Sequence, residues 1–141
     1  MRIAIINGPN LNLLGKRENG IYGKESFEVY FEKLRVWFPH IQFSMFQSNI
    51  EGELVDYLQQ ADGVFDGIIL NAGGYTHTSV TIADTVKAVS IPVVEVHISN
   101  ILARESFRHI SLIAPFCRGS LFGFGLAGYS LAAEYLSNSK E

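Results

Sequence analysis

The 141-residue sequence has one cysteine, Cys117, so no disulfide can form within a chain, which suits a reducing compartment such as the cytosol. Basic residues are also scarce: eleven Lys and Arg against fourteen Asp and Glu give a net charge of -3, without a basic block. Because nucleic-acid phosphates require clustered Lys and Arg, no nucleic-acid partner is expected. The apolar start, residues 2–7, is too short for a signal peptide or a membrane span. We therefore expect a cytoplasmic protein that has no membrane partner.

Metal-binding spacing and a suitably placed lysine are also lacking. His77, Glu95 and His97 are the nearest approach to a ligand set, but no His-x-x-x-His or cysteine spacing accompanies them, so no metal is expected. A Schiff-base lysine needs a desolvated position to lose its proton. None of the lysines follows a predicted strand, since they lie in a loop, in predicted helices or at the tail: Lys16, Lys24, Lys33, Lys87 and Lys140. For Cys117, the role of a small buried hydrophobic residue is favoured over that of a nucleophile, although the neighbouring residues leave both roles open.

What the sequence does contain is the material of one packed domain. Hydrophobic residues make up 48% and charged residues 18%, and a chain of this length buries roughly two thirds of its unfolded surface. Apolar periodicity predicts strands over 2–7, 41–46, 67–71, 92–97 and 111–114. It predicts helices from Ser26 to Pro39, over 51–61, from Thr78 or Ser79, and after a Gly-rich turn at 119–128. Strict alternation of strand and helix indicates an α/β domain with a doubly wound, five-stranded parallel sheet.

The connection from Gly8 to Lys24 is the most informative segment. It follows an apolar strand, lacks a helical period and carries Asn10, Asn12, Arg17 and Tyr22. Connections of this length are rare in a compact domain unless they form a lid or a binding loop. Ligands of such sheets bind outside the carboxyl ends of the strands. Polar residues follow the other strands at that edge, including Asn71, His77, His97 and Ser99.

Arg17 and Tyr22 suggest base chemistry. A phenol with a pKa near 10 is ionised only about one part in a thousand at pH 7, so its use as a base costs ~4 kcal/mol. One adjacent cation lowers a pKa by roughly 1 to 3 units, which covers part of that cost, and a second cation would help.

Plainer interpretations exist for each of these residues. Tyr22, before Gly23, is equally well a turn residue whose ring covers the core. His97 ends a Val-rich strand with Glu95 on the same face, so it is either a hydrogen-bonded core histidine or a group at the ligand edge. Arg104 and Arg108 form either a solvated charge cluster or a clamp for a carboxylate or hydroxyl.

A rival class of function is a flavodoxin-like module that binds a nucleotide or flavin without catalysis. Such a module needs a phosphate-binding loop rich in glycine or hydroxyls directly after the first strand. Gly8-Pro9-Asn10 is poor in glycine, and Pro9 removes an amide donor. A structural subunit with a relic pocket is the third possibility.

Several motifs in order resemble the type II 3-dehydroquinate dehydratases along nearly the whole chain. They are NGPNLNLLG (7–15), Arg17 with Tyr22-Gly23, EGEL (51–54), YTHTS (75–79), VEVHISN (94–100) and RESFRHIS (104–111). The resemblance implies a flavodoxin-like fold and a hydro-lyase that converts 3-dehydroquinate to 3-dehydroshikimate in the shikimate pathway of aromatic amino acid biosynthesis. It further implies an enolate route with no metal, Schiff base or other cofactor.

The resemblance also implies residue roles. Tyr22 would remove the proton alpha to the ketone, Arg17 would lower its pKa, and His97 would protonate the departing hydroxyl. Asn12 would hold a water against the enolate oxygen. The remaining residues would bind substrate hydroxyls and the carboxylate: Asn71, His77, Arg108 and the amides of Ile98 and Ser99. Asp84 would reach the substrate of a neighbouring subunit, because the family assembles trimers into dodecamers.

Overall fold

A computed structural model describes residues 1–16 and 25–139 and contains one parallel sheet with the strand order β2-β1-β3-β4-β5. Every neighbouring pair of strands is parallel. The strands are β1 (Arg2–Asn7), β2 (Gln42–Gln47), β3 (Gly67–Asn71), β4 (Val93–His97) and β5 (Gly119–Phe122), and the helices are α2 (Phe27–Trp37), α3 (Glu51–Ala61), α4 (Val80–Ala88) and α5 (Ala127–Asn138). The predicted doubly wound α/β architecture is confirmed.

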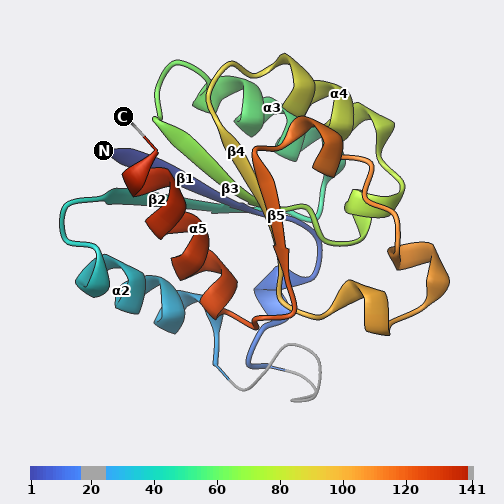
Figure 1. Ribbon diagram of the computed structural model, residues 1–141, viewed down its shortest axis with the longest axis horizontal. Coiled ribbons are helices and arrows are strands. Elements are labelled where there is room, and N and C mark those ends of the chain that lie inside the picture. Colours follow the sequence, from blue (N-terminus) through green and yellow to red (C-terminus); the bar gives the residue numbers. More distant parts are fainter. Residues whose placement is uncertain (17–24, 140–141) are drawn as a thin grey trace.

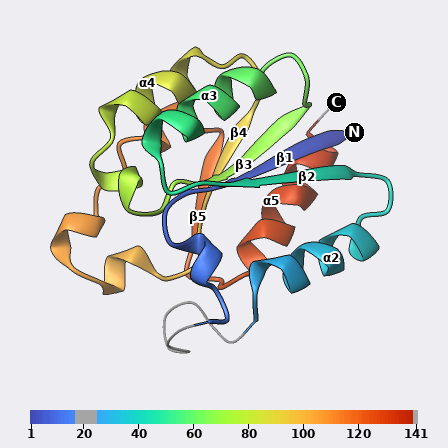
Figure 2. The ribbon, with the colours of Figure 1, turned by 180° about the vertical axis from the view of Figure 1, so that it is seen from behind.

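The helices cover both faces of the sheet, α2 and α5 on one side and α3 and α4 on the other (Figures 1 and 2). The sheet separates two hydrophobic cores, and alternate residues of β1 point into each. Ile3 and Ile5 pack against α2 and α5, while Ala4 and Ile6 pack against α3 and α4. Because both faces are buried, β1 and β3 have apolar residues on both faces ahead of their terminal asparagines and lack polar alternation.

Serine caps begin two of the helices where the sequence predicts them. The Ser26 hydroxyl accepts a hydrogen bond from the amide of Val29 at 3.3 Å, and the Ser79 hydroxyl accepts one from Ile82 at 2.9 Å. Such caps satisfy amides that the first turn leaves without a partner. The cap at Ser79 fixes where α4 begins relative to the loop that follows β3.

The predicted fifth strand at 111–114 is wrong, because the fifth strand is β5 at Gly119–Phe122. The Ser111 side chain accepts a hydrogen bond from the Ala114 amide, which bends the backbone, and Ala114–Phe116 forms a short 3-10 helix with Pro115 in its first turn. Ile113 is fully buried in the core beneath α3 and α4. The apolar run thus fills the core as a loop, while the strand falls in the segment predicted as a Gly-rich turn.

The order in which strands are added to the sheet reverses between β1 and β3, because the chain passes from β1 to its neighbour β2 and then adds β3 on the other side of β1. At this point the backbones approach closely: the Gly8 amide donates to the Asn71 carbonyl at 2.7 Å. A Cβ atom at Gly8 would lie 2.5 Å from the Ala72 carbonyl oxygen. Residue 8 is therefore restricted to glycine at the topological switch point, where α/β sheets bind ligands.

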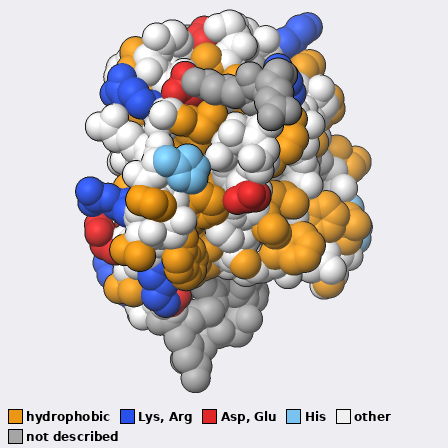
Figure 3. All heavy atoms as spheres, turned by 60° about the vertical axis from the view of Figure 1, so that its left-hand side comes forward, with side chains coloured by type: hydrophobic (Ala, Val, Ile, Leu, Met, Phe, Trp, Pro, Cys, Tyr) orange, Lys and Arg blue, Asp and Glu red, His pale blue; other side chains and the backbone are white. Residues whose placement is uncertain are grey.

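The surface matches the composition. Figure 3 shows the left-hand side of Figure 1, with a broad area of hydrophobic side chains and separate Lys and Arg groups. Large apolar side chains stay exposed on α2, including Val36 and Trp37. Within residues 1–16 and 25–139, no helix has the length and apolar character needed to cross a bilayer.

Candidate active site

A pocket of about 130 Å³ lies at the carboxyl ends of β1, β3 and β4. The loop after β1 contributes Pro9 and Asn10, and the remaining walls follow β3 and β4. These walls include most of the predicted ligand-binding residues: Asn71, His77, His97, Ile98, Ser99 and Arg108. The structure thus places around one pocket six residues that the family resemblance assigns to one substrate.

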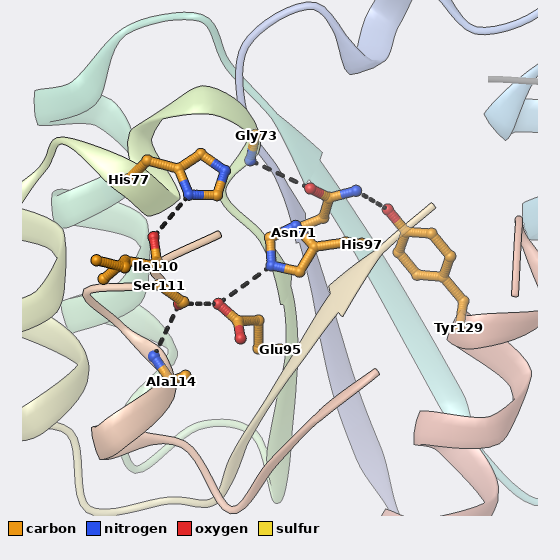
Figure 4. A network of polar contacts seen from close by, with 9 residues as sticks. All are labelled: Asn71, Gly73, His77, Glu95, His97, Ile110, Ser111, Ala114 and Tyr129. Atoms are coloured by element: carbon orange, nitrogen blue, oxygen red, sulfur yellow. Dashed lines mark hydrogen bonds and ion pairs between the residues drawn. The ribbon is translucent and has the colours of Figure 1, made fainter. Parts of the chain in front are cut away.

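His97 is paired with a buried carboxylate. Its Nε2 atom lies 3.2 Å from Oε2 of Glu95, although the alignment falls short of a hydrogen bond (Figure 4). Burial acts to raise the pKa of Glu95, but His97 and hydrogen bonds from Ser111 and Ser120 outweigh it and hold this pKa below its usual value. Glu95 is therefore ionised at neutral pH and places a negative charge beside the His97 imidazole.

His77 is fixed by a backbone acceptor. Its Nδ1 atom lies 2.8 Å from the Ile110 carbonyl oxygen. A carbonyl only accepts, so Nδ1 carries the proton of this hydrogen bond and Nε2 is left to the pocket. The rings of His77 and His97 are stacked with centroids 6.2 Å apart. Two imidazoles thus stand side by side over the pocket.

Asn71 is held in one orientation at the floor of the site. Its Oδ1 accepts from the Gly73 amide at 3.1 Å, and its Nδ2 donates to the Tyr129 hydroxyl at 3.0 Å. That hydroxyl in turn donates to Oδ1 of Asn7 at 2.7 Å. Burial strongly raises the pKa of Tyr129, so the phenol stays protonated and acts as a fixed relay between β1 and β3. One N–H of the Asn71 amide remains for a ligand.

Two guanidinium groups line the same pocket. Arg104 Nη1 donates to the Ser99 hydroxyl at 3.2 Å, and Arg108 Nε donates to Glu105 at 2.9 Å. The buried Nε of Arg104 has no hydrogen-bond partner among the described residues and lies 4.0 Å from Glu105. Both cations are therefore placed where an anionic ligand such as a carboxylate could meet them.

Of the four remaining predicted residues, two fall outside the described part of the chain and two do not line the pocket. Arg17 and Tyr22 are outside the described residues. Asn12 is exposed in the 3-10 helix Leu11–Leu13, with Gln47 Nε2 3.5 Å from its Oδ1, and does not line the pocket. Asp84 is exposed on α4, away from this pocket.

Sequence reasoning missed the supports of the site. Glu95 was considered as a partner of a core histidine and in a metal-ligand set that was set aside, and no role at the site was predicted for Tyr129 or Ser111. A charged residue within a Val-rich strand was the available signal for Glu95, because buried carboxylates are rare unless they are paired. Tyr129 had no such signal, since its partner Asn71 is 58 residues away.

Two other kinds of chemistry were considered for the described residues, a cysteine nucleophile and a metal site. Burial, together with the charge of Glu95, raises the pKa of Cys117 to about 12, so its thiol stays protonated near neutral pH. Among residues 1–16 and 25–139, no group of three His, Cys, Asp or Glu side chains is placed to hold a metal ion.

Known proteins are similar to this chain in sequence and in fold. The family model described as "Dehydroquinase class II" matches residues 1–137. The "3-dehydroquinate dehydratase" of Fusobacterium nucleatum is 53% identical over 141 residues, 96% of each chain, and that of Campylobacter jejuni is 53% identical over 134 residues, 94% of this chain and 84% of the relative. The crystal structure of type II dehydroquinase from Butyrivibrio crossotus superimposes with a TM-score of 0.94 at 45% identity, covering 98% of each chain. The chain belongs to the class II dehydroquinase family.

Proposed function

We propose that the protein dehydrates 3-dehydroquinate to 3-dehydroshikimate and water, the shikimate-pathway step for which its family is named. The observation that carries this proposal is the pocket itself, where His97, backed by the ionised Glu95, shares the lining with Arg104 and Arg108. A substrate that has a carboxylate and a departing hydroxyl requires both a cationic clamp and a proton donor.

The proposed reaction is a stepwise elimination. The Tyr22 phenolate, stabilised by Arg17, takes the proton alpha to the ketone, and the electron pair moves onto the carbonyl oxygen as an enolate. The enolate then collapses, the carbon–hydroxyl bond breaks, and His97 gives its proton to the departing oxygen to release water. Because Glu95 faces Nε2 of His97, Nδ1 is the nitrogen assigned to this transfer. Asn12 is proposed to hold a water against the enolate oxygen, which requires its side chain to turn from Gln47 towards the pocket.

Substrate binding is assigned to the fixed polar groups of the pocket. Asn71, His77 and the amides of Ile98 and Ser99 are proposed to bind hydroxyls and the carboxylate, together with Arg108. The hydrogen bonds that fix Asn71 and His77 support this assignment, since their side chains need no rearrangement before binding.

A second copy of the chain completes the proposal. Asp84 is exposed on α4 and does not line the pocket of its own chain, so we assign it to the substrate region of a neighbouring subunit in a dodecamer built from four trimers. Exposed apolar side chains such as Val36, Trp37 and Phe107 are available for contacts between subunits. We place the enzyme in the cytoplasm, where its one cysteine stays reduced.

One assay tests the reaction and its class. Purified protein is treated with a chelator, 3-dehydroquinate is added, and the conjugated enone of the product is followed in the ultraviolet with and without borohydride. We expect activity to survive both treatments. Loss on chelation would indicate a metal, loss with borohydride a Schiff base, and no absorbance change a binding module without catalysis.

Removal of Arg17 tests the proposed base. Arg17→Ala is expected to lower kcat about tenfold to a thousandfold at neutral pH, because one adjacent cation shifts a pKa by roughly 1 to 3 units. The matched control is Lys16→Ala, which removes a neighbouring charge and is expected to leave kcat within about twofold. Near-full turnover of Arg17→Ala at neutral pH would refute the role of Arg17.

A further inference from the structure

Three consecutive residues of the loop before β5 contact His77 of the pocket wall and two residues next to that wall, Glu95 and Thr76. The Ile110 carbonyl holds Nδ1 of His77 at 2.8 Å, the Ser111 hydroxyl donates to Oε2 of Glu95 at 2.5 Å, and the Leu112 amide donates to the Thr76 carbonyl at 2.9 Å. Figure 4 shows the Ile110 carbonyl facing His77 and the Ser111 hydroxyl facing Glu95. The segment 110–112 therefore sets the positions of groups from the loop after β3 and from β4.

The hydrogen bonds of Ser111 have a fixed direction. The Ala114 amide donates to its oxygen at 3.0 Å, so the hydroxyl proton is free to point at Glu95 (Figure 4). This proton meets the same carboxylate oxygen that faces Nε2 of His97. A hydroxyl that donates to a carboxylate favours its ionised form, so Glu95 is kept as an acceptor opposite the imidazole.

Few other polar groups influence Glu95. Within the described residues, the titratable and polar groups that act on it are His97 on β4, Ser120 on β5 and Cys117, whose buried thiol feels its charge, while His77 stacks on the far side of His97. No lysine or arginine is among the causes that lower its pKa. Removal of the Ser111 hydroxyl would therefore leave the buried carboxylate with one fewer hydrogen bond.

We propose that Ser111 is a positioning residue for the proton donor, acting on His97 through the carboxylate of Glu95. The inference rests on the proposed function, since it assigns a second supporting residue to that same site. Ser111 does not line the pocket, so a role in binding substrate directly is not needed to explain its contacts.

The test compares Ser111→Ala with Ser111→Thr, which keeps the hydroxyl. Ser111→Ala is expected to lower kcat about tenfold with KM within about twofold, because a hydrogen bond to a charged group is lost behind the proton donor and not at the substrate. Ser111→Thr is expected to restore most of kcat. Ser106→Ala, at an exposed serine of the same loop, is the control and should match the wild type.

The acid side of the pH profile separates a positioning role from a structural one. Protonation of Glu95 removes the charge behind His97, so kcat should fall as the pH drops, and in Ser111→Ala this fall should begin about one pH unit higher. The position of the fall does not depend on how much enzyme is folded. An unchanged profile, or an equal loss of kcat in Ser111→Thr, would overturn the proposal.

A measurement without substrate distinguishes this inference from the proposed function. The carboxyl carbon of Glu95 is followed by ¹³C NMR during an acid titration, with its signal assigned by its loss in Glu95→Gln. Its midpoint should move to higher pH in Ser111→Ala whether or not the protein dehydrates 3-dehydroquinate. An unmoved midpoint would contradict the proposed contact, whereas a missing ultraviolet signal in the wild type would contradict only the proposed reaction.

Discussion

Replacement of His97 by asparagine is expected to lower kcat about a hundredfold to ten-thousandfold, the usual contribution of a positioned general acid. An amide cannot give a proton to the departing hydroxyl, whereas the imidazolium beside Glu95 can. The asparagine amide can still donate to the carboxylate, so the buried charge keeps a hydrogen-bond donor nearby. KM should therefore change much less than kcat.

Steady-state kinetics at several pH values check this expectation. The control is His40→Asn, because His40 lies far from the pocket and its ring contacts Ser137 at 3.1 Å. The pKa of Glu95 is lowered in the fold, so in the wild type the carboxylate is present at neutral pH and is lost only as the pH falls through that lowered pKa. His97→Asn should lose this acid-side dependence along with its rate. Turnover within tenfold of wild type at neutral pH would show that another group donates the proton.

A second large effect is expected on stability. Gly8→Ala should lower the free energy of unfolding by about 2 to 3 kcal/mol, the range typical of an overpacked core. The added Cβ would lie 2.5 Å from the oxygen and 2.7 Å from the carbonyl carbon of Ala72, and both atoms are backbone. No side-chain rotation can relieve this overlap, so β1 and β3 must move apart where the Gly8 amide meets the Asn71 carbonyl.

Urea unfolding followed by circular dichroism measures the loss at Gly8. Gly52→Ala is the matched control, because a Cβ at Gly52 would meet no atom within 4 Å and this glycine lies in the first turn of α3. Alanine is the better helix former, so the control should be neutral or more stable by up to about 1 kcal/mol. Equal unfolding midpoints for Gly8→Ala and the wild type would mean that the ends of the two strands can separate without cost.

Local patterns in the sequence were enough to predict most of the fold. The buried runs of β1 and β3 and the capped helices after Ser26 and Ser79 each depend on residues close together in the chain. The prediction failed at the fifth strand, because the mostly apolar residues 111–114 resemble a buried strand. Tertiary contacts decide there, because the Ser111 side chain bonds Glu95 and the Ala114 amide while Ile113 fills the core.

The candidate site was predictable to a similar extent. The edge rule for parallel sheets predicted that Asn71, His77 and His97 would meet, because it needs only the places where strands end. The supporting contacts were beyond this reasoning, since Tyr129 joins Asn7 across 122 residues and no local pattern encodes such a distance. The sequence also could not show that the Asn12 side chain lies outside the pocket, because side-chain direction in a short 3-10 helix does not follow from the sequence alone.

The strand order determines which parts of the sheet must form before the pocket can bind a ligand. The pocket draws on segments from Pro9 to Arg108, and these meet only when β1, β3 and β4 are all paired. A fragment that ends before β4 would lack one whole wall of the pocket, including His97. A ligand in this pocket therefore binds the complete native sheet and not a partly folded chain, so its binding energy stabilises the fold as one cooperative unit.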